Sequence, residues 1–394
     1  MTLPDTTIIE TRPRRLRALF AFAVLALAGS LMLYYRAKDT LAGGDDYQSA
    51  DWLINYGAGF VRRGLFGELF LAVAPPGGLW LLFLVQAVPY AVVFAFAVWL
   101  LHRNDYSWSI IALVCGPAAL GFFGWDPGAG FRKEVLTYVV LALLVWSVAA
   151  AMARVARILL TVAALVVFVL AVFSWETSAL FLPAIGYVLL RRPEGQESLV
   201  VVRRWLAGAF VAVGGVGLAL GTLFHGTEQT AAAICDTVRA HGFDGVALCT
   251  GAIDAIGWSS SYTLASVAES FPLYLGYLPL LALAVIPIVA SGWFRTAKVW
   301  AIVIAASFLP LFVIVTDYGR WINMLVMALL FCIAVAKPEL SFSRIWAPLA
   351  AVLYVCLWGL PHWLPAGFDG AWPWFGLLPS VVNTVLDVAR AVFA

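Results

Sequence analysis

Residues 79–101 form the apolar run LWLLFLVQAVPYAVVFAFAVWLL, which contains no charged side chain. A helix needs about 20 such residues to cross the hydrocarbon core of a bilayer. The apolar residues are continuous and do not alternate with polar ones, which favours a helix over a strand of a membrane barrel. Residues 79–101 therefore predict a membrane-spanning helix.

The composition extends this prediction to the whole chain. Of the 394 residues, 63% are hydrophobic and 12% are charged, whereas a soluble domain is about half apolar and about a quarter charged. We therefore expect an all-α, polytopic bundle of about 11 spans (about 10 to 13), in which residues 1–394 form one integral membrane domain. The other predicted spans are residues 18–35, 108–124, 135–152, 158–173, 177–190, 205–224, 272–290, 299–315, 321–336 and 345–361.

The charges predict the orientation. The polar tail, residues 1–17, ends in a cluster of arginines, and the apolar run after it continues beyond the ALA sequence at 26–28 that resembles a signal-peptide cleavage site. We therefore expect an uncleaved anchor with a cytoplasmic N-terminus. Alternating from there places most Lys and Arg inside, as the positive-inside rule requires. The sequence thus predicts a bacterial inner-membrane protein with extracytoplasmic loops at 36–78 and 225–271.

The C-terminal segment, residues 362–394, contains one further apolar stretch at 374–392. Asp387 and Arg390 make this stretch amphipathic, which is typical of a helix lying in the membrane interface. We therefore predict an interfacial segment here and not a twelfth span.

Charged residues gather at the corners that this topology places outside. Charges near hydrocarbon are costly and tend to be paired or functional, so their concentration on one face predicts a functional site there. The corners are GGDDY (43–47) and GFVRRG (59–64) in the first loop, followed by WDPGAGFRKE (125–134), SWET (174–177) and DYGRW (317–321).

The acidic candidates are Asp45, Asp46 and Glu176. A carboxylate near a low-dielectric boundary can have its pKa raised toward values useful for proton abstraction, so each is a candidate catalytic residue. The aspartate pair also offers oxygen ligands to Mg²⁺ or Mn²⁺, although the sequence does not establish a metal site. The alternatives are a solvated turn for the aspartate pair and a helix N-terminal carboxylate for Glu176.

Basic residues in the corners predict a phosphate site, because arginine grips phosphate through a planar fork of donors. The alternative is structural pairing within a corner, between Arg132 and either Asp126 or Glu134. Asp317 would pair with Arg320 in the same way. The phosphate-binding candidates are Arg62, Arg63, Arg132, Lys133 and Arg320.

Aromatic and cysteine residues complete the predicted outer face. Trp125, Trp175 and Trp321 adjoin the charged corners, where their rings would offer stacking surfaces to a ligand, although tryptophans also form belts at membrane interfaces. Cys235 and Cys249 share the long outer loop. An extracytoplasmic loop is in an oxidising space, so these two cysteines are candidates for a disulfide.

With Asp45-Asp46 directly after the first span, the chain resembles the GT-C superfamily of membrane glycosyltransferases, whose donor is a sugar on a polyprenyl phosphate. The resemblance implies that Asp46 activates the acceptor and that the basic corners bind the donor phosphate. The long loop after the seventh span is closer to the layout of polysaccharide polymerases and ligases, which use similar donors. Expected partners are the bilayer, this donor and a glycan or lipid acceptor.

A transporter is the main alternative to an enzyme. The same arginines would suit a transporter or flippase for an anionic lipid or sugar phosphate, but transporters usually show inverted repeats and charges near the bilayer midplane. We find neither in the sequence. Binding to nucleic acid is not expected, because the net charge is only +2 and no basic run occurs.

Overall fold

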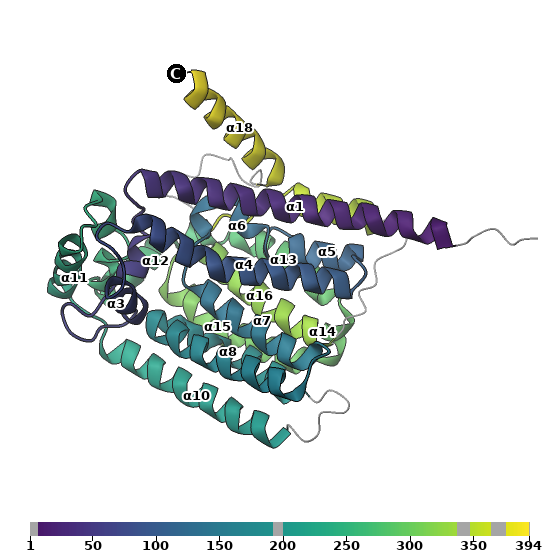
Figure 1. Cartoon of the computed structure of the whole chain (residues 1–394), viewed down its shortest axis with the longest axis horizontal. Helices are drawn as coiled ribbons and strands as arrows, with labels where there is room; N and C mark the ends of the chain where they lie inside the picture. Colours follow the sequence, from purple (N-terminus) through teal and green to yellow (C-terminus); the bar gives the residue numbers. More distant parts are fainter. Residues whose placement is uncertain (1–6, 192–199, 337–346, 364–375, 394) are drawn as a thin grey trace, which may run out of the picture.

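The computed structural model describes residues 7–191, 200–336, 347–363 and 376–393, and these residues are all helical apart from turns and one isolated bridge between Gly57 and Gly59. The predicted all-α class is confirmed. The main helices lie side by side in one bundle (Figure 1). They are α1 (Thr7–Leu41), α4 (Leu79–Arg103), α7 (Glu134–Ala149), α8 (Arg154–Ser174), α9 (Leu182–Leu190), α10 (Val200–Leu223), α13 (Tyr277–Val289), α15 (Lys298–Ile314), α16 (Tyr318–Ala336) and α17 (Ala347–Cys356).

Within the described ranges, five helices are long and apolar enough to cross a membrane. Several shorter apolar helices accompany them, among them α7, α13 and α15. The five candidate spans are Pro13–Leu41, Leu79–Arg103, Arg154–Ser174, Val201–Leu223 and Tyr318–Ala336.

Helix α16 is the centre of the bundle. Inside its apolar window 89% of residues are buried, against 22% to 33% in the other four candidate spans. It packs against α7, α9, α13 and α15. A helix that is apolar on every side must be enclosed by protein or by lipid, and here it is enclosed by the other helices.

The predicted span 108–124 is wrong as a single helix. The chain forms α5 (Trp108–Cys115), breaks at Gly116, and resumes as the short α6 (Phe122–Trp125). The break precedes Pro117, and a residue before proline is disfavoured in the α region. The Asn323 side chain of α16 donates to the backbone carbonyls of Ala118 and Ala119, both at 3.1 Å, so carbonyls freed by the break are satisfied.

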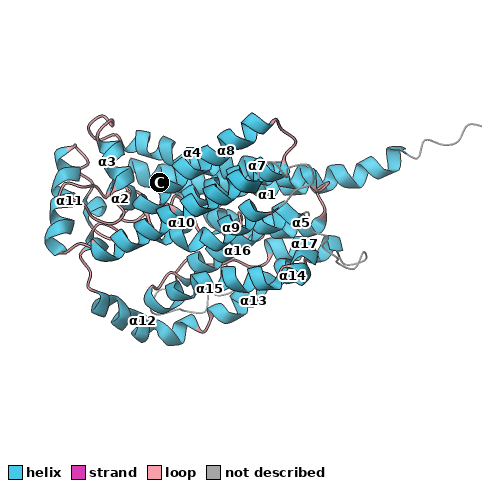
Figure 2. Ribbon diagram, turned by 90° about the horizontal axis from the view of Figure 1, so that it is seen from below, coloured by secondary structure: helices cyan, strands magenta, loops and turns pink. Residues whose placement is uncertain are grey.

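The two predicted outer loops fold into helices that gather at one end of the bundle (Figures 1 and 2). They are α2 (Ala50–Leu53) and α3 (Leu65–Leu71) from the first loop, and α11 (Glu228–Ala240) and α12 (Ser260–Tyr274) from the long one. A Cβ on Gly245 would lie 2.0 Å from the carbonyl oxygen of Gly43. Only glycine permits this approach, so the long loop packs directly on the turn that carries the aspartate pair.

Helix α18 (Leu377–Phe393) contains the stretch predicted to lie in the membrane interface. It projects from the side of the bundle next to α1 (Figure 1). The hydroxyl groups of Tyr35 and Thr384 are 3.1 Å apart and link it to α1. The rest of the predicted C-terminal segment, residues 364–375, lies outside the described residues.

Candidate functional site

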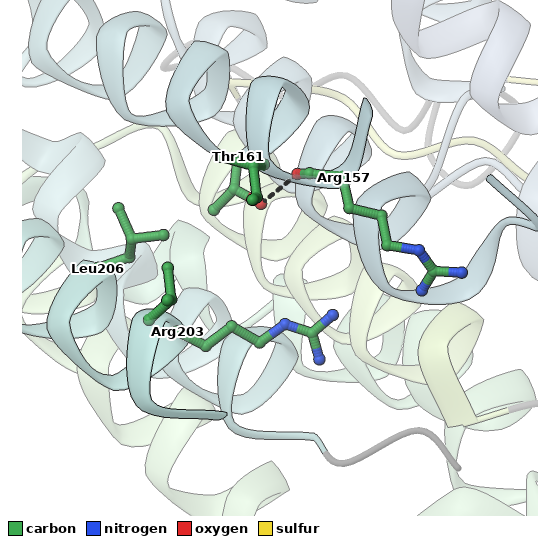
Figure 3. Close-up of a pocket in the computed structure, with 6 residues that line it drawn as sticks. Arg157, Thr161, Arg203 and Leu206 are labelled. Atoms are coloured by element: carbon green, nitrogen blue, oxygen red, sulfur yellow. Dashed lines mark hydrogen bonds between the residues drawn. The ribbon is translucent and has the colours of Figure 1, made fainter. Parts of the chain in front are cut away.

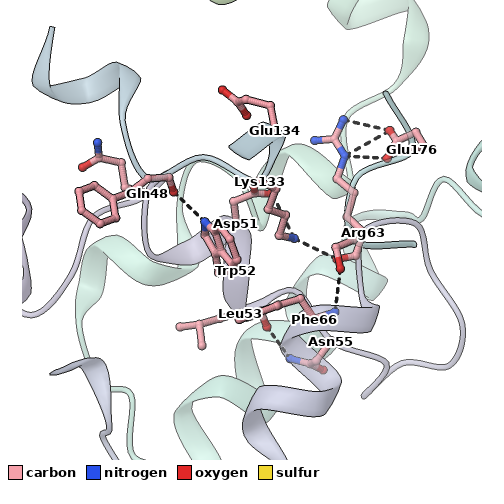
Figure 4. Close-up of polar contacts among 12 residues, drawn as sticks. Gln48, Asp51, Trp52, Leu53, Asn55, Arg63, Phe66, Lys133, Glu134 and Glu176 are labelled. Carbon is pink, nitrogen blue, oxygen red and sulfur yellow. Dashed lines mark hydrogen bonds and ion pairs between the residues drawn. The ribbon is translucent and has the colours of Figure 1, made fainter. Parts of the chain in front are cut away.

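The charged corners meet at the end of the bundle that carries the outer-loop helices. Arg63 binds Glu176 in a fork, with Nε and Nη2 both 3.0 to 3.2 Å from the carboxylate oxygens, and Arg62 lies 3.5 Å from the same group (Figure 4). The first loop is thereby fixed to the start of the helical segment after α8. Both arginines interact with Glu176. These three residues therefore belong to the charged framework, the set of ion-paired side chains that surrounds the site.

Lys133 forms a second connection between corners. Its side chain is 1% exposed, and Nζ lies 3.5 Å from Asp51 and donates to the carbonyl of Arg63 at 3.0 Å (Figure 4). Burial lowers the pKa of Lys133 to about 8, against the opposing effect of Asp51. Arg63 itself has a φ of 70°, a conformation that non-glycine residues adopt only where surrounding contacts impose it. The network of Arg63, Lys133 and Glu176 supplies those contacts.

Arg320 forms the third set of ion pairs. Its Nε and Nη2 donate to Glu134 at 3.1 and 2.8 Å, and its Nη1 donates to Asp317 at 2.8 Å. The guanidinium also lies over the rings of Trp175 and Trp321, 5.6 and 5.2 Å from their centroids. The sequence analysis gave pairing of Asp317 with Arg320 as the alternative to phosphate binding, and the structure contains this pair. Glu134, in contrast, pairs with Arg320 and not with Arg132.

The predicted tryptophans do not form an open stacking surface. Trp175 and Trp321 lie nearly parallel with centroids 6.4 Å apart, and both are buried, at 3% exposure. Trp125 is buried as well, at 2%. Trp175 and Trp321 instead pack against the guanidinium of Arg320.

Arg132 differs from the other basic residues. In the described part of the chain Arg132 forms no ion pair, and its Nε donates one hydrogen bond, to the carbonyl of Gly128 at 3.3 Å. Its guanidinium lies 4.9 Å from the ring centroid of Tyr47. Asp46 and Asp317 both interact with it electrostatically. Arg132 is therefore a buried cation, 5% exposed, whose charge is not neutralised by a bound carboxylate.

The aspartate pair divides into two roles. Asp45 closes the turn, because its Oδ1 accepts from the backbone N–H of Tyr47 at 2.8 Å and also from that of Gln48. Asp46 has its backbone carbonyl held by the N–H of Ala252 at 2.8 Å, and its carboxylate interacts electrostatically with Arg132. Burial first, and the charge of Asp45 second, raise the pKa of Asp46 above its usual value. Its environment therefore favours a proton acceptor more than that of Asp45 does.

The disulfide supports the position of Asp46. Cys235 and Cys249 are bonded to each other, so the pair considered from the sequence is joined in the structure. Gly251, two residues after the bond, has a φ of 56°, and a Cβ there would lie 2.6 Å from the carbonyl oxygen of Asp46. The bond thus holds the long loop closed where it touches the aspartate turn.

The sequence analysis missed His362. Its backbone N–H and its Nδ1 both donate to Oδ2 of Asp126, at 2.7 and 2.8 Å. Burial opposes ionisation of Asp126, but His362 outweighs this effect and lowers the pKa of that carboxyl. A histidine oriented in this way presents Nε2 as a second proton-exchanging group. Its position directly after the last predicted span was the available signal, because that position is another outer corner.

Gly319 allows His362 to reach the site. A Cβ on Gly319 would lie 1.8 Å from the carbonyl oxygen of Pro361, and its N–H donates to the carbonyl of His362 at 3.2 Å. Gly319→Ala is therefore expected to lower the stability by about 1–3 kcal/mol through overpacking and to displace His362. Thermal unfolding in detergent measures the first effect. Gly208→Ala is the matched control, because a Cβ there has nothing within 4 Å, and equal losses for both variants would contradict the expectation.

The site offers cations, carboxylates and a histidine, but no assembled metal centre. In the ranges that the structure describes, no three His, Cys, Asp or Glu side chains are grouped so that they could hold a metal ion. Comparison with protein-family models, curated proteins and solved structures finds no match to the chain. What the arrangement can do chemically is bind an anion at Arg132 and exchange a proton at Asp46 or His362.

Proposed function

We propose that the chain is a membrane glycosyltransferase that moves a sugar from a polyprenyl-phosphate-linked donor to a glycan, lipid or protein acceptor on the extracytoplasmic face. One observation supports it most: Arg132 is a buried guanidinium without a carboxylate partner in the described residues, beside an aspartate whose pKa is raised. A phosphate-bearing donor needs such a cation, and an attacking hydroxyl needs such a base.

The membrane arrangement belongs to the same proposal. Eleven spans, a cytoplasmic N-terminus and a bacterial inner membrane would place the Arg132 end outside. The shorter apolar helices of the bundle would then cross the bilayer together with the five long ones. The GT-C-like layout remains supported by the position of Asp45-Asp46 immediately after the first long helix.

The proposed reaction uses few groups. Arg132 binds the donor phosphate and stabilises the charge that develops on it as the bond to the anomeric carbon breaks. The acceptor oxygen attacks that carbon from the opposite side and inverts it, and its proton passes to Asp46. The polyprenyl phosphate leaves with the bonding electrons. Arg62, Arg63, Lys133 and Arg320 hold the corners in place around the site through their own ion pairs.

Binding of the donor phosphate is the direct test. Purified protein in nanodiscs should bind polyprenyl phosphate more tightly than polyprenol, which lacks the phosphate. Arg132→Gln is expected to weaken binding of polyprenyl phosphate by about 10- to 100-fold, because a charge-assisted hydrogen bond contributes about 1.5–3 kcal/mol. Binding of polyprenol should not change. The control is Arg239→Gln, at an exposed arginine on α11, which should bind both lipids as wild type does.

A transporter would bind the same lipid without breaking a bond. Membranes containing the native sugar-carrying lipid are therefore incubated with wild-type protein, and released polyprenyl phosphate is measured by mass spectrometry. Release that depends on Asp46 supports the transferase. Movement of the intact lipid across the membrane without release would replace it with the transport alternative, with Arg132 as a binding residue only.

A further inference from the structure

The far end of α8 and α10 carries a concentration of positive charge that the proposed reaction does not use. The two helices pack together, and both end near the candidate site, at Ser174 and Leu223. Their N-terminal turns therefore lie together at the opposite end of the bundle (Figure 1). Neither first turn contains an acidic residue. Each contains a pair of arginines: Arg154 and Arg157 in α8, and Arg203 and Arg204 in α10.

A pocket lies between these turns (Figure 3). It is lined by Arg157, Ile158, Thr161, Val202, Arg203 and Leu206. The side chains of Arg157 and Arg203, one from each helix, extend in roughly the same direction in this view. Arg203 is 6% exposed, so the charge at this pocket lies below the protein surface.

Arg157 retains an unused donor. Its Nε and Nη2 donate to the carbonyls of Met152 and Ala150 at 3.1 and 3.3 Å, which fixes the guanidinium in place. Its Nη1 is buried and has no hydrogen-bond partner among the residues that the structure describes. A buried donor without an acceptor costs about 1–3 kcal/mol, so a ligand oxygen at this point would be favourable.

The local field favours an anion. The first turn of a helix carries a partial positive charge, which stabilises anions and disfavours cations. Here two first turns and two arginine side chains converge on one pocket. The helix surfaces beside it are apolar and exposed: Leu159 at 63% and Trp205 at 79%. A ligand with an anionic headgroup and hydrocarbon chains could contact both the basic pocket and the apolar helix surfaces beside it.

We propose that this pocket binds the phosphate headgroup of an anionic phospholipid, with Arg157 and Arg203 on the phosphate and the acyl chains along the exposed apolar faces of α8 and α10. Basic pockets between membrane helices are known sites for such headgroups. In the proposed topology the pocket opens to the cytoplasmic leaflet. Glu194 and Glu197 lie in the neighbouring segment outside the described residues, and the experiment below separates their effect from that of a lipid.

The test uses the purified full chain. Binding of phosphatidylglycerol and phosphatidylcholine is measured by native mass spectrometry, and thermal stability is measured with each lipid and with inorganic phosphate. We expect retention and stabilisation with phosphatidylglycerol only. Arg157→Gln should weaken phosphatidylglycerol binding by about 10-fold or more. Arg154→Gln, at an exposed arginine in the same turn, is the control and should bind as wild type.

Other outcomes would overturn the proposal. Equal binding of the two lipids, or equal losses for Arg154→Gln and Arg157→Gln, would mean that no specific site exists. Stabilisation by inorganic phosphate alone would identify a free anion as the ligand. If no anion has any effect, we would conclude that carboxylates of the chain, such as Glu194 or Glu197, neutralise the arginines, and the proposal would be wrong. If Arg157→Gln does not fold, Leu206→Trp fills the pocket, keeps both arginines and should abolish lipid binding.

Discussion

Replacing Asp46 with asparagine is expected to reduce turnover of the lipid-linked donor by about 100- to 10,000-fold, which is the usual contribution of a positioned general base. Asparagine keeps the shape of the side chain and leaves the backbone contact of residue 46 with Ala252 intact. The loss should therefore appear in kcat with little change in donor binding. Release of polyprenyl phosphate, measured by mass spectrometry over time, gives the rate.

The pH dependence provides the control for this substitution. Burial and Asp45 raise the pKa of Asp46, so Asp46 stays protonated to a higher pH than an ordinary aspartate, whose pKa is about 3.9. Because the base must be ionised, turnover should rise with pH through this raised pKa. Asp45→Asn removes one of the causes and should move the rise to lower pH. If Asp46→Asn retains wild-type turnover and His362→Gln does not, the proton acceptor is His362.

Replacing Glu134 with glutamine is expected to destabilise the protein by about 3–5 kcal/mol, because it breaks a buried ion pair and leaves the charge of Arg320 only partly compensated. Glu134 is 1% exposed, and its two oxygens bind Nε and Nη2 of Arg320. Asp317 remains as a partner for Nη1 only. Thermal unfolding in detergent, followed by circular dichroism, measures the loss.

A double-mutant cycle isolates the pair. Adding Arg320→Gln to Glu134→Gln removes both charges and should recover part of the stability, whereas independent effects would add. Asp105→Asn is the matched control, because it breaks an ion pair with Arg14 in which the side chains are 72% and 46% exposed. Exposed pairs contribute about 0–1 kcal/mol. A loss for Glu134→Gln no larger than for Asp105→Asn would contradict the structural role of the pair.

The apolar runs predicted where most helices lie, because the length and composition of a run depend only on local sequence. The break at Gly116 was not predicted, because the sequence stays apolar on both sides of it. The proline at 117 was the local signal for the break. The sequence also predicted that the charged corners would share one face. It could not predict which charges pair. The partnership of Glu134 with Arg320 joins helices that are far apart in the chain, and only their packing brings the two side chains together.

The same limit applies to the candidate site. The sequence predicted Arg132, Arg62 and Arg63 alike as phosphate-binding residues. They differ in the structure because Glu176 binds Arg62 and Arg63 and does not bind Arg132. His362 fell in the segment 362–394 that was predicted to be interfacial. Its contact with Asp126 joins residues that are 236 positions apart, so local sequence did not indicate it. The sequence therefore indicated which charged residues belong to the candidate site. Only the three-dimensional arrangement showed which of them form ion pairs with each other and which are available to a ligand.

The enclosure of α16 has a consequence for biosynthesis. This helix is the last of the five long apolar ones to leave the ribosome, yet it lies between helices that are made before it. In the proposed membrane topology, the earlier helices would therefore remain in the bilayer with the central position vacant until α16 is inserted. Insertion of α16 also delivers Arg320 to Glu134, so the ion pair forms only when the central position is filled. A nascent chain truncated before Asp317 should consequently be a preferred substrate for membrane proteases.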